Sequence, residues 1–217
     1  MNNTFSWDLF YQMPIVGILR NFPTETMDGL AFYYAESGLT NLEITMNSEG
    51  AESTIAFLCQ KYGTRLNIGA GTVCTLDDLD KALHAGAQFI VTPILDEDVI
   101  KSCVAKGVPI FPGAYTPTEI YQAWKWGASM VKVFPASRLG PEFIKEVLAP
   151  LNQIKLMPTG GVNLENCITF LKAGAKGLGM GGQLFPKELI QQREWEQVSG
   201  IFKQFVEKVQ AFQAVQT

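Results

Sequence analysis

The chain has 217 residues, of which 47% are apolar and 18% charged, with a formal net charge of −4 at pH 7. This balance is typical of a globular protein with a large core. The acidic charge argues against a nucleic acid partner, because nucleic-acid-binding proteins usually carry a basic surface. The apolar runs are only as long as strands, so we expect no membrane partner, and the first residues do not resemble a signal peptide.

Cysteine and histidine usage narrows the possible chemistry further. The four cysteines lie far apart and form no C-x-x-C pair: Cys59, Cys74, Cys103 and Cys167. We expect reduced thiols in a cytoplasmic protein. The only histidine, His84, is expected on a helix away from the strand ends, in a structural role. A single histidine excludes a His-rich metal site, and we predict no metal and no cofactor.

Short apolar segments alternate regularly with helical segments along the chain. The predicted strands are 15–19, 42–45, 66–70, 89–92, 108–111, 131–135, 154–157 and 177–180. The predicted helices are 6–11, 24–36, 49–62, 75–85, 96–105, 116–126, 142–148, 163–173 and 194–212. Capping boxes at Thr75–Asp78 and Thr116–Glu119 mark two of the helix starts. Glycines that can adopt the left-handed conformation follow four helices: Gly38, Gly86, Gly127 and Gly174.

Eight strands, each followed by a helix and with no Pro- or Ser-rich linker, predict a single domain over residues 1–217. The expected fold is a (β/α)8 TIM barrel with a short N-terminal helix and an extra C-terminal helix. A doubly wound open sheet is the alternative. That fold usually carries a G-x-G-x-x-G turn after its first strand, whereas this chain has Leu19-Arg20-Asn21. In such a barrel the functional residues collect at the C-terminal ends of the strands.

A lysine lies in the middle of the predicted strand Val131-Lys132-Val133-Phe134-Pro135. Burial lowers the pKa of a lysine, and a neutral amine is a nucleophile. Lys132 is therefore a candidate for Schiff-base formation with a carbonyl substrate. The alternative is a lysine at a strand end whose amine reaches water.

Glu43 is likewise a charged residue within an apolar strand, where a carboxylate can move protons. Its alternative role is a salt bridge to Lys132 or Arg20. The double glycines Gly160-Gly161 and Gly181-Gly182 follow the last two strands. The corresponding loops of such barrels often bind phosphate through backbone N–H groups, although glycines also simply make tight turns. Cys74 is expected near the barrel mouth without a catalytic partner nearby in sequence.

Eight ordered blocks of the chain resemble the bacterial 2-keto-3-deoxy-6-phosphogluconate (KDPG) aldolase / 4-hydroxy-2-oxoglutarate (KHG) aldolase family over roughly residues 10–190. The matching motifs are Gly17-Ile-Leu-Arg20, Leu42-Glu-Ile-Thr45, Gly69-Ala-Gly-Thr-Val73, Phe111-Pro-Gly113, Thr116-Pro-Thr-Glu119, Val131-Lys-Val-Phe-Pro-Ala136, Pro158-Thr-Gly-Gly161 and Gly181-Gly182. Any one block alone would be a weak signal.

The resemblance implies a metal-free class I aldolase that assembles as a homotrimer. Its expected reaction is the reversible cleavage of a small keto acid to pyruvate and an aldehyde. The keto acid is a 2-keto-3-deoxy (6-phospho) sugar acid or 4-hydroxy-2-oxoglutarate, and the aldehyde is glyceraldehyde 3-phosphate or glyoxylate. The resemblance assigns the Schiff base to Lys132 and acid–base catalysis through a water to Glu43. It further implies that Thr72 holds the pyruvate carboxylate. The other implied substrate-binding residues line the pocket or hold the phosphate: Arg20, Pro93, Phe134, Thr159, Gly160, Gly161, Gly181 and Gly182.

Two positions depart from the family pattern. Asn47 stands where many members carry an arginine that helps hold the carboxylate, and Gln183 replaces a small hydroxyl residue. Both leave the Schiff-base chemistry intact and concern the choice of substrate. Two other functional classes stay open from the sequence. One is a barrel that binds a phosphorylated metabolite without Schiff-base chemistry, isomerase-like or purely binding, with Lys132 as a counter-ion. The other is a structural barrel in an assembly.

Overall fold

The computed structural model describes residues 4–215, in which parallel strands alternate with helices. The strands are β1 (Ile15–Leu19), β2 (Asn41–Thr45), β3 (Asn67–Gly71), β4 (Phe89–Val91), β5 (Ile110–Phe111), β6 (Gly113–Ala114), β7 (Val131–Val133), β8 (Leu156–Pro158) and β9 (Leu178–Met180). The helices are α1 (Trp7–Gln12), the 3₁₀ turn η1 (Thr24–Thr26), α2 (Met27–Glu36), α3 (Ala51–Tyr62), α4 (Leu76–His84), α5 (Glu97–Ala105), α6 (Pro117–Lys125), α7 (Gly140–Leu148), α8 (Cys167–Lys172), α9 (Lys187–Gln191) and α10 (Trp195–Ala214).

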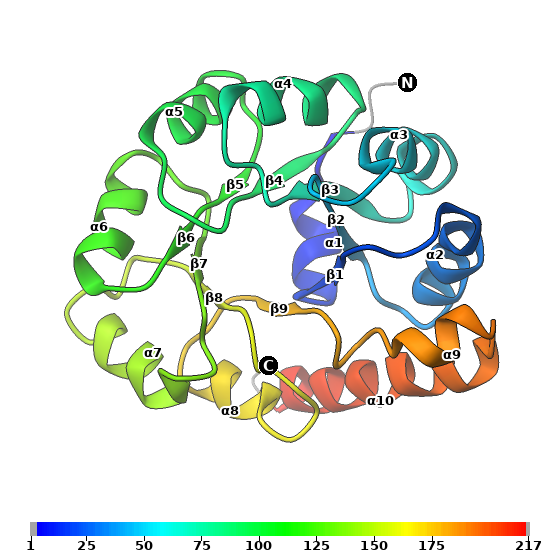
Figure 1. Ribbon diagram of the computed structural model, residues 1–217. Helices are drawn as coiled ribbons and strands as arrows, with labels where there is room; N and C mark the ends of the chain where they lie inside the picture. The colour runs from blue at the N-terminus through cyan, green and yellow to red at the C-terminus, as the bar shows by residue number, and fades with distance from the viewer. Residues whose placement is uncertain (1–3, 216–217) are drawn as a thin grey trace.

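The strands form two parallel sheets, in the orders β5-β4-β3-β2-β1-β9 and β6-β7-β8. β5 and β6 are separated by Pro112 alone. An isolated parallel bridge between Thr159 and Gly179 joins the end of β8 to β9. The strands lie inside and the helices outside them (Figure 1). This α/β arrangement directs the C-terminal ends of all strands to the same face.

Two apolar clusters fill the fold. The larger cluster packs the helices against the outer side of the strands and includes Leu42, Ile68 and Leu178. The smaller cluster consists of the inward-facing residues Phe10, Val16, Phe89, Val91, Phe111, Met130 and Met157. Phe10 belongs to α1, so this helix closes the inner cluster from one end. In the view of Figure 1, α1 lies behind the strands.

Buried amides attach α1 to the N-terminal ends of the strands. Asn67 accepts a hydrogen bond from the Ser6 N–H and donates one to the Ser6 carbonyl, both at 2.8 Å. The Asn41 side chain donates to the Met13 carbonyl at 2.9 Å. These bonds satisfy buried polar groups that would otherwise be costly. They also hold α1 across the N-terminal ends of the strands, which closes this end of the fold. The opposite end is left for a site.

The predicted caps and helix ends are confirmed. Thr75 and Asp78 form a capping box at the start of α4, and Thr116 and Glu119 form another at α6. Ser6 caps α1 by accepting a hydrogen bond from the Leu9 N–H. All four glycines expected to be left-handed have positive φ: Gly38 (91°), Gly86 (95°), Gly127 (99°) and Gly174 (108°).

Three predicted elements differ clearly from the observed ones, and one observed helix was not predicted. The helix expected over 24–36 begins as the 3₁₀ turn η1. The strand expected over 108–111 begins only at Ile110 and resumes after Pro112 as β6, because prolines at 109 and 112 have no N–H for a ladder. The helix expected from residue 163 begins at Cys167, and α9 was not predicted.

Side chains explain the late start of α8. Asn163 Oδ1 accepts hydrogen bonds from the N–H groups of Glu165 and Asn166 at 2.9 and 3.0 Å. Asn166 Oδ1 in turn accepts from the Asn163 N–H at 2.8 Å. Asparagine side chains that bind nearby backbone groups compete with helix formation, so these residues form a turn before the helix.

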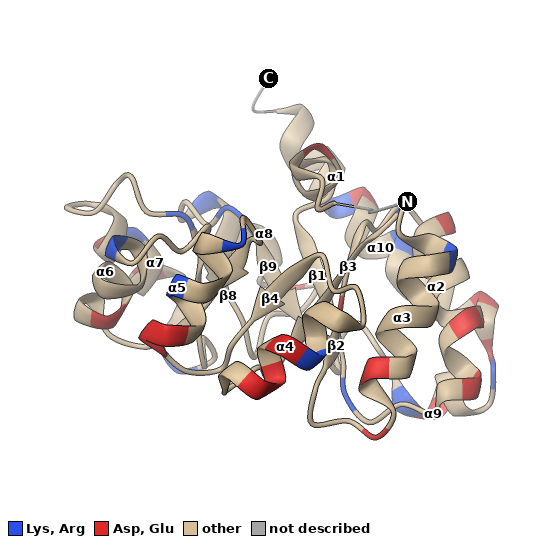
Figure 2. Cartoon of the chain, turned by 90° about the horizontal axis from the view of Figure 1, so that it is seen from above, with Lys and Arg blue, Asp and Glu red and all other residues tan. Residues whose placement is uncertain are grey.

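Charged residues lie mostly on the helices and loops (Figure 2). Within the nine strands of residues 4–215, Glu43 and Lys132 are the only charged side chains. No helix in this described part of the chain has both the length and the apolar character needed to cross a membrane.

Candidate active site

Lys132 lies at the centre of β7 and is 5% exposed. Its neighbours across the sheet are Gly113 on β6 and Met157 on β8. The amine lies 4.9 Å from the centroid of the Phe134 ring. Burial lowers the pKa of Lys132 from its ordinary value; Glu43 opposes this shift and Arg20 adds to it. The environment therefore favours the neutral, nucleophilic amine.

Glu43 lies in the middle of β2 and is 1% exposed. Its Oε2 is buried without a hydrogen-bond partner among residues 4–215. Burial raises the pKa of this carboxyl group, while Lys132 and Arg20 act in the opposite direction. A buried carboxyl with a raised pKa and a free oxygen is suited to hold and release a proton.

Small residues on β3 make room for Glu43. Gly69 is its partner in the β2–β3 register, and Gly71 follows two residues later on the same face. A Cβ on Gly71 would overlap the Glu43 carboxyl group. Glycine at position 71 is thus a steric requirement for the observed position of Glu43.

Arg20 and Thr72 meet at the C-terminal ends of β1 and β3. The Arg20 guanidinium donates a hydrogen bond to Thr72 Oγ1 at 3.3 Å. Thr72 has a positive φ of 57°, a conformation that is uncommon for a residue with a branched Cβ. Positive φ values in branched residues often occur at functional sites. The pair offers a guanidinium and a hydroxyl to an anionic group.

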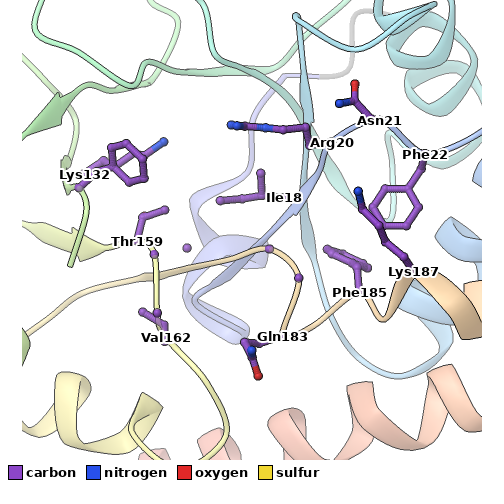
Figure 3. A pocket seen from close by; sticks show the side chains of 16 residues that line it. Ile18, Arg20, Asn21, Phe22, Lys132, Thr159, Val162, Gln183, Phe185 and Lys187 are labelled. Carbon is purple, nitrogen blue, oxygen red and sulfur yellow. The ribbon is translucent and has the colours of Figure 1, made fainter. Parts of the chain in front are cut away.

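A cavity of about 360 Å³ opens beside Lys132 at this end of the strands (Figure 3). It is lined by Ile18, Arg20, Asn21, Phe22, Lys132, Phe134, Thr159, Gly160, Gly161, Val162, Gly179, Gly181, Gly182, Gln183, Phe185 and Lys187. Three of these residues are cationic and none is acidic. The size and charge of the cavity fit a small anionic metabolite.

Two glycine turns form one wall of the cavity. Gly160 and Gly161 have φ values of 89° and 77°. A Cβ on Gly161 would lie 2.6 Å from the Ser137 Cβ, so a side chain there would also be excluded by space. Gly181 accepts hydrogen bonds from the N–H groups of Leu184 and Phe185 at 2.9 and 3.1 Å, which fixes the second turn.

Eight of the predicted site residues line the cavity: Lys132, Arg20, Phe134, Thr159, Gly160, Gly161, Gly181 and Gly182. Three do not. Glu43 lies deeper between the strands, and Thr72 contacts Arg20. Pro93 lies with its carbonyl group against Gly113 on β6.

Sequence reasoning missed several residues of this cavity, notably Asn21, Phe22, Phe185 and Lys187. Asn21 and Phe22 directly follow Arg20 at the C-terminal end of β1, so their position after a strand end could have identified them as cavity residues. Lys187 begins a short helix that no periodic pattern predicts.

Other positions singled out in the sequence lie outside the cavity. Asn47 is exposed and is not among the lining residues. His84 is exposed on α4, with Nδ1 at 2.7 Å from the Asp80 carbonyl oxygen. The Cys74 thiol lies 3.6 Å from the Thr72 carbonyl oxygen. Within residues 4–215 no group of three His, Cys, Asp or Glu side chains is placed to hold a metal ion.

The geometry agrees with comparisons to known proteins. The sequence model of the family described as KDPG and KHG aldolase matches residues 9–201. The chain belongs to this family. A 2-dehydro-3-deoxy-6-phosphogalactonate aldolase of Escherichia coli (strain K12) is 33% identical over 200 residues, covering 92% of this chain and 98% of that protein. A 2-dehydro-3-deoxy-phosphogluconate aldolase of Haemophilus influenzae is 35% identical over 198 residues, covering 90% and 92%.

A solved structure extends the likeness to three dimensions. A KDPG aldolase from Legionella pneumophila, with pyruvate captured at low pH as a covalent carbinolamine intermediate, superposes with a TM-score of 0.84 at 25% identity. The match covers 90% of this chain and 95% of that one. The chain is a carbon–carbon lyase of the 2-dehydro-3-deoxy-phosphogluconate aldolase type.

Proposed function

We propose that this KDPG/KHG-family lyase is a class I aldolase. It reversibly cleaves a 2-keto-3-deoxy-6-phospho sugar acid to pyruvate and glyceraldehyde 3-phosphate, through a Schiff base on Lys132. The observation that carries this proposal is the pair Lys132 and Glu43. They are the two charged residues within the described strands, both are buried, and burial shifts each pKa toward the neutral form.

Lys132 acts first in the cleavage direction. Its neutral amine attacks the C2 ketone to give a carbinolamine, and loss of water gives an iminium ion. The iminium nitrogen accepts the electron pair of the C3–C4 bond as that bond breaks. The product on the enzyme is an enamine, and the C4 carbon leaves as the aldehyde. Protonation of the enamine at C3 and hydrolysis then release pyruvate and restore the amine.

Glu43 moves the protons in this sequence. It helps carbinolamine dehydration as an acid and, as a base, takes the proton of the C4 hydroxyl during bond cleavage. The proton then returns to C3 of the enamine. Its free Oε2 supports transfer through one bound water, because no described residue occupies that oxygen's hydrogen-bonding position.

The anionic ends of the substrate are assigned to opposite parts of the cavity. Arg20 and Thr72 hold the carboxylate next to the reacting ketone, which their mutual hydrogen bond supports. The turns at Gly160–Gly161 and Gly181–Gly182 hold the distal phosphate through backbone N–H groups. Phe134, Thr159 and Pro93 complete the proposed substrate-binding set.

The closed barrel and the trimer are part of the same proposal. A (β/α)8 ring is supported by β1–β9 pairing, by the Thr159–Gly179 bridge and by the continuity of β5 and β6 around Pro112. A homotrimer is the proposed assembly, and the exposed aromatic residues Phe32, Phe57 and Tyr121 are candidates for its interfaces. Sedimentation equilibrium should give three times the chain mass.

Borohydride reduction in the presence of pyruvate tests the chemistry. The reduced pyruvate adduct is expected on Lys132, one per chain, as located by peptide mass spectrometry. Lys132→Met should abolish the adduct, and exposed Lys125→Met should not change it. If no adduct forms, or if it forms on another lysine, the class I mechanism is wrong. A barrel that binds the metabolite with Lys132 as a counter-ion would then be the better account.

A further inference from the structure

We propose that Lys187 binds the distal phosphate of the substrate and makes the enzyme favour phosphorylated over unphosphorylated keto acids. The proposal rests on the function given above and deepens it. Lys187 is the first residue of α9 and lines the same cavity as Lys132. In Figure 3 its side chain lies with Phe22 and Phe185 on the side away from Lys132.

The charges along the cavity leave a role for this lysine. The three cations that line it are Arg20, Lys132 and Lys187, and none of the lining residues is acidic. Lys132 has a lowered pKa and is consumed by the Schiff base. Arg20 is held at the reacting end by Thr72. A second anionic group on the substrate therefore has one lining cation left to meet it.

Lys187 is also free to bind. Among residues 4–215 no salt bridge or side-chain hydrogen bond engages its amine, whereas exposed lysines such as Lys81 and Lys101 are paired with acidic residues on their own helices. An unpaired lysine that lines a cavity without carboxylates is available to an anion.

The segment that leads into Lys187 is anchored by Phe185. Phe185, two residues earlier, is 1% exposed and packs on Tyr34 and Phe22 with ring centroids 5.9 and 6.2 Å apart. Its N–H donates to the Gly181 carbonyl, which ties the start of α9 to the second glycine turn. Backbone N–H groups of the turn and the amine can thus act on one phosphate group. Gln183 adds a neutral amide to the same wall.

The discriminating experiment compares two substrates in one variant. Lys187→Met should raise KM for 2-keto-3-deoxy-6-phosphogluconate by about 10–100-fold, the loss expected for a charge-assisted contact. KM for the unphosphorylated 2-keto-3-deoxygluconate, whose far end is an uncharged hydroxyl, should stay within about twofold, since that contact is absent there. The inhibition constant of inorganic phosphate should rise together with KM for the phosphorylated substrate.

Two controls complete the design. Lys187→Arg keeps the charge and should restore most of the affinity, and Lys125→Met, an exposed lysine on α6, should change neither substrate. Equal effects on both substrates, or none on the phosphorylated one, would overturn the assignment of Lys187. Pyruvate trapping on Lys132 separates the proposed Schiff-base function from the proposed role of Lys187. If trapping persists and Lys187→Met leaves KM for both substrates unchanged, only the role of Lys187 is wrong. If trapping is absent in the parent enzyme, the Schiff-base function itself is wrong.

Discussion

Glu43 occupies the space that any side chain at position 71 would need. The two residues lie on the neighbouring strands β2 and β3, and a Cβ on Gly71 would overlap the Glu43 carboxyl group. The buried position of this carboxyl group therefore depends on the absence of a methyl group next to it.

Gly71→Ala should displace Glu43 and lower kcat. General acid–base groups contribute about 10²–10⁴-fold to rate, so a fall within this range is expected. Pyruvate trapping on Lys132 should persist, because the amine is not displaced. The measurement is steady-state kinetics together with borohydride trapping and a thermal melt. Gly200→Ala is the matched control: a Cβ there meets nothing within 4 Å, and alanine favours the helix. Normal kcat in folded Gly71→Ala would contradict the dependence.

Glu43→Gln should shift the pH dependence of Schiff-base formation to lower pH. In the parent enzyme the Glu43 charge raises the pKa of Lys132 against the lowering effects of burial and Arg20. Glu43 is the largest influence that raises this pKa, so without its charge burial and Arg20 lower the pKa further and the amine becomes neutral at lower pH. The midpoint of adduct formation against pH measures this shift, while kcat should fall by about 10²–10⁴-fold. Glu207→Gln on α10 is an exposed control. An unchanged midpoint would show that the Glu43 charge does not act on Lys132, and an upward shift would contradict the direction of its effect.

Removing both buried charges should stabilise the fold while abolishing activity. The folded-state pKa of Lys132 lies below its ordinary value of 10.5, so its burial cost is fully present below the lowered pKa and disappears as pH rises toward 10.5. The pKa of Glu43 lies above its ordinary value of 4.5, so its cost appears as pH rises through that interval. At neutral pH, Lys132→Met combined with Glu43→Leu, which replaces both charges by apolar side chains of similar size, should raise the free energy of unfolding by about 1–4 kcal/mol.

Urea unfolding at neutral pH measures this difference. Lys132→Met alone should be less stable than the double variant, because it leaves the Glu43 carboxyl group without its opposite charge. A double variant that is less stable than the parent enzyme would mean that the pair holds the strands together. The two charges would then have a structural role at this site.

The sequence located the two buried charges of this site better than the walls of its cavity. Lys132 and Glu43 were found because a charge inside a short apolar run is a local signal. Lys187 was missed because a helix of five residues leaves no periodic pattern. The contact between Glu43 and Gly71 depends on the register of two strands, which the sequence of either strand alone does not contain.

The predicted elements failed where side chains or prolines act on the backbone. Asn163 and Asn166 bind backbone N–H groups and delay α8, although the helical pattern starts at residue 163. Pro112 divides one expected strand into β5 and β6. The capping boxes and the four left-handed glycines were predicted correctly, because their signals lie within a few residues of sequence.

The residue at position 47 bears on which keto acid the enzyme binds. It stands where many family members carry an arginine, and it is exposed in the loop that follows β2. Its neighbour Ser48 accepts a hydrogen bond from the Asn21 N–H at 2.9 Å, so this loop contacts the segment that carries Arg20. This connection is the reason to test whether an arginine at position 47 adds a cation to the Arg20–Thr72 pair.

Asn47→Arg should lower KM for 2-keto-3-deoxy-6-phosphogluconate and leave kcat nearly unchanged, which is the signature of added uniform binding. A charge-assisted contact changes affinity by roughly 10–150-fold, which sets the upper limit of the effect. Asn47→Gln, longer but neutral, should leave both constants as they are. Loss of activity in Asn47→Arg would instead identify Asn47 as a specificity residue. If the variant is folded and still traps pyruvate on Lys132, the aldolase assignment would stand, and the phosphogluconate substrate would have to be replaced by another keto acid.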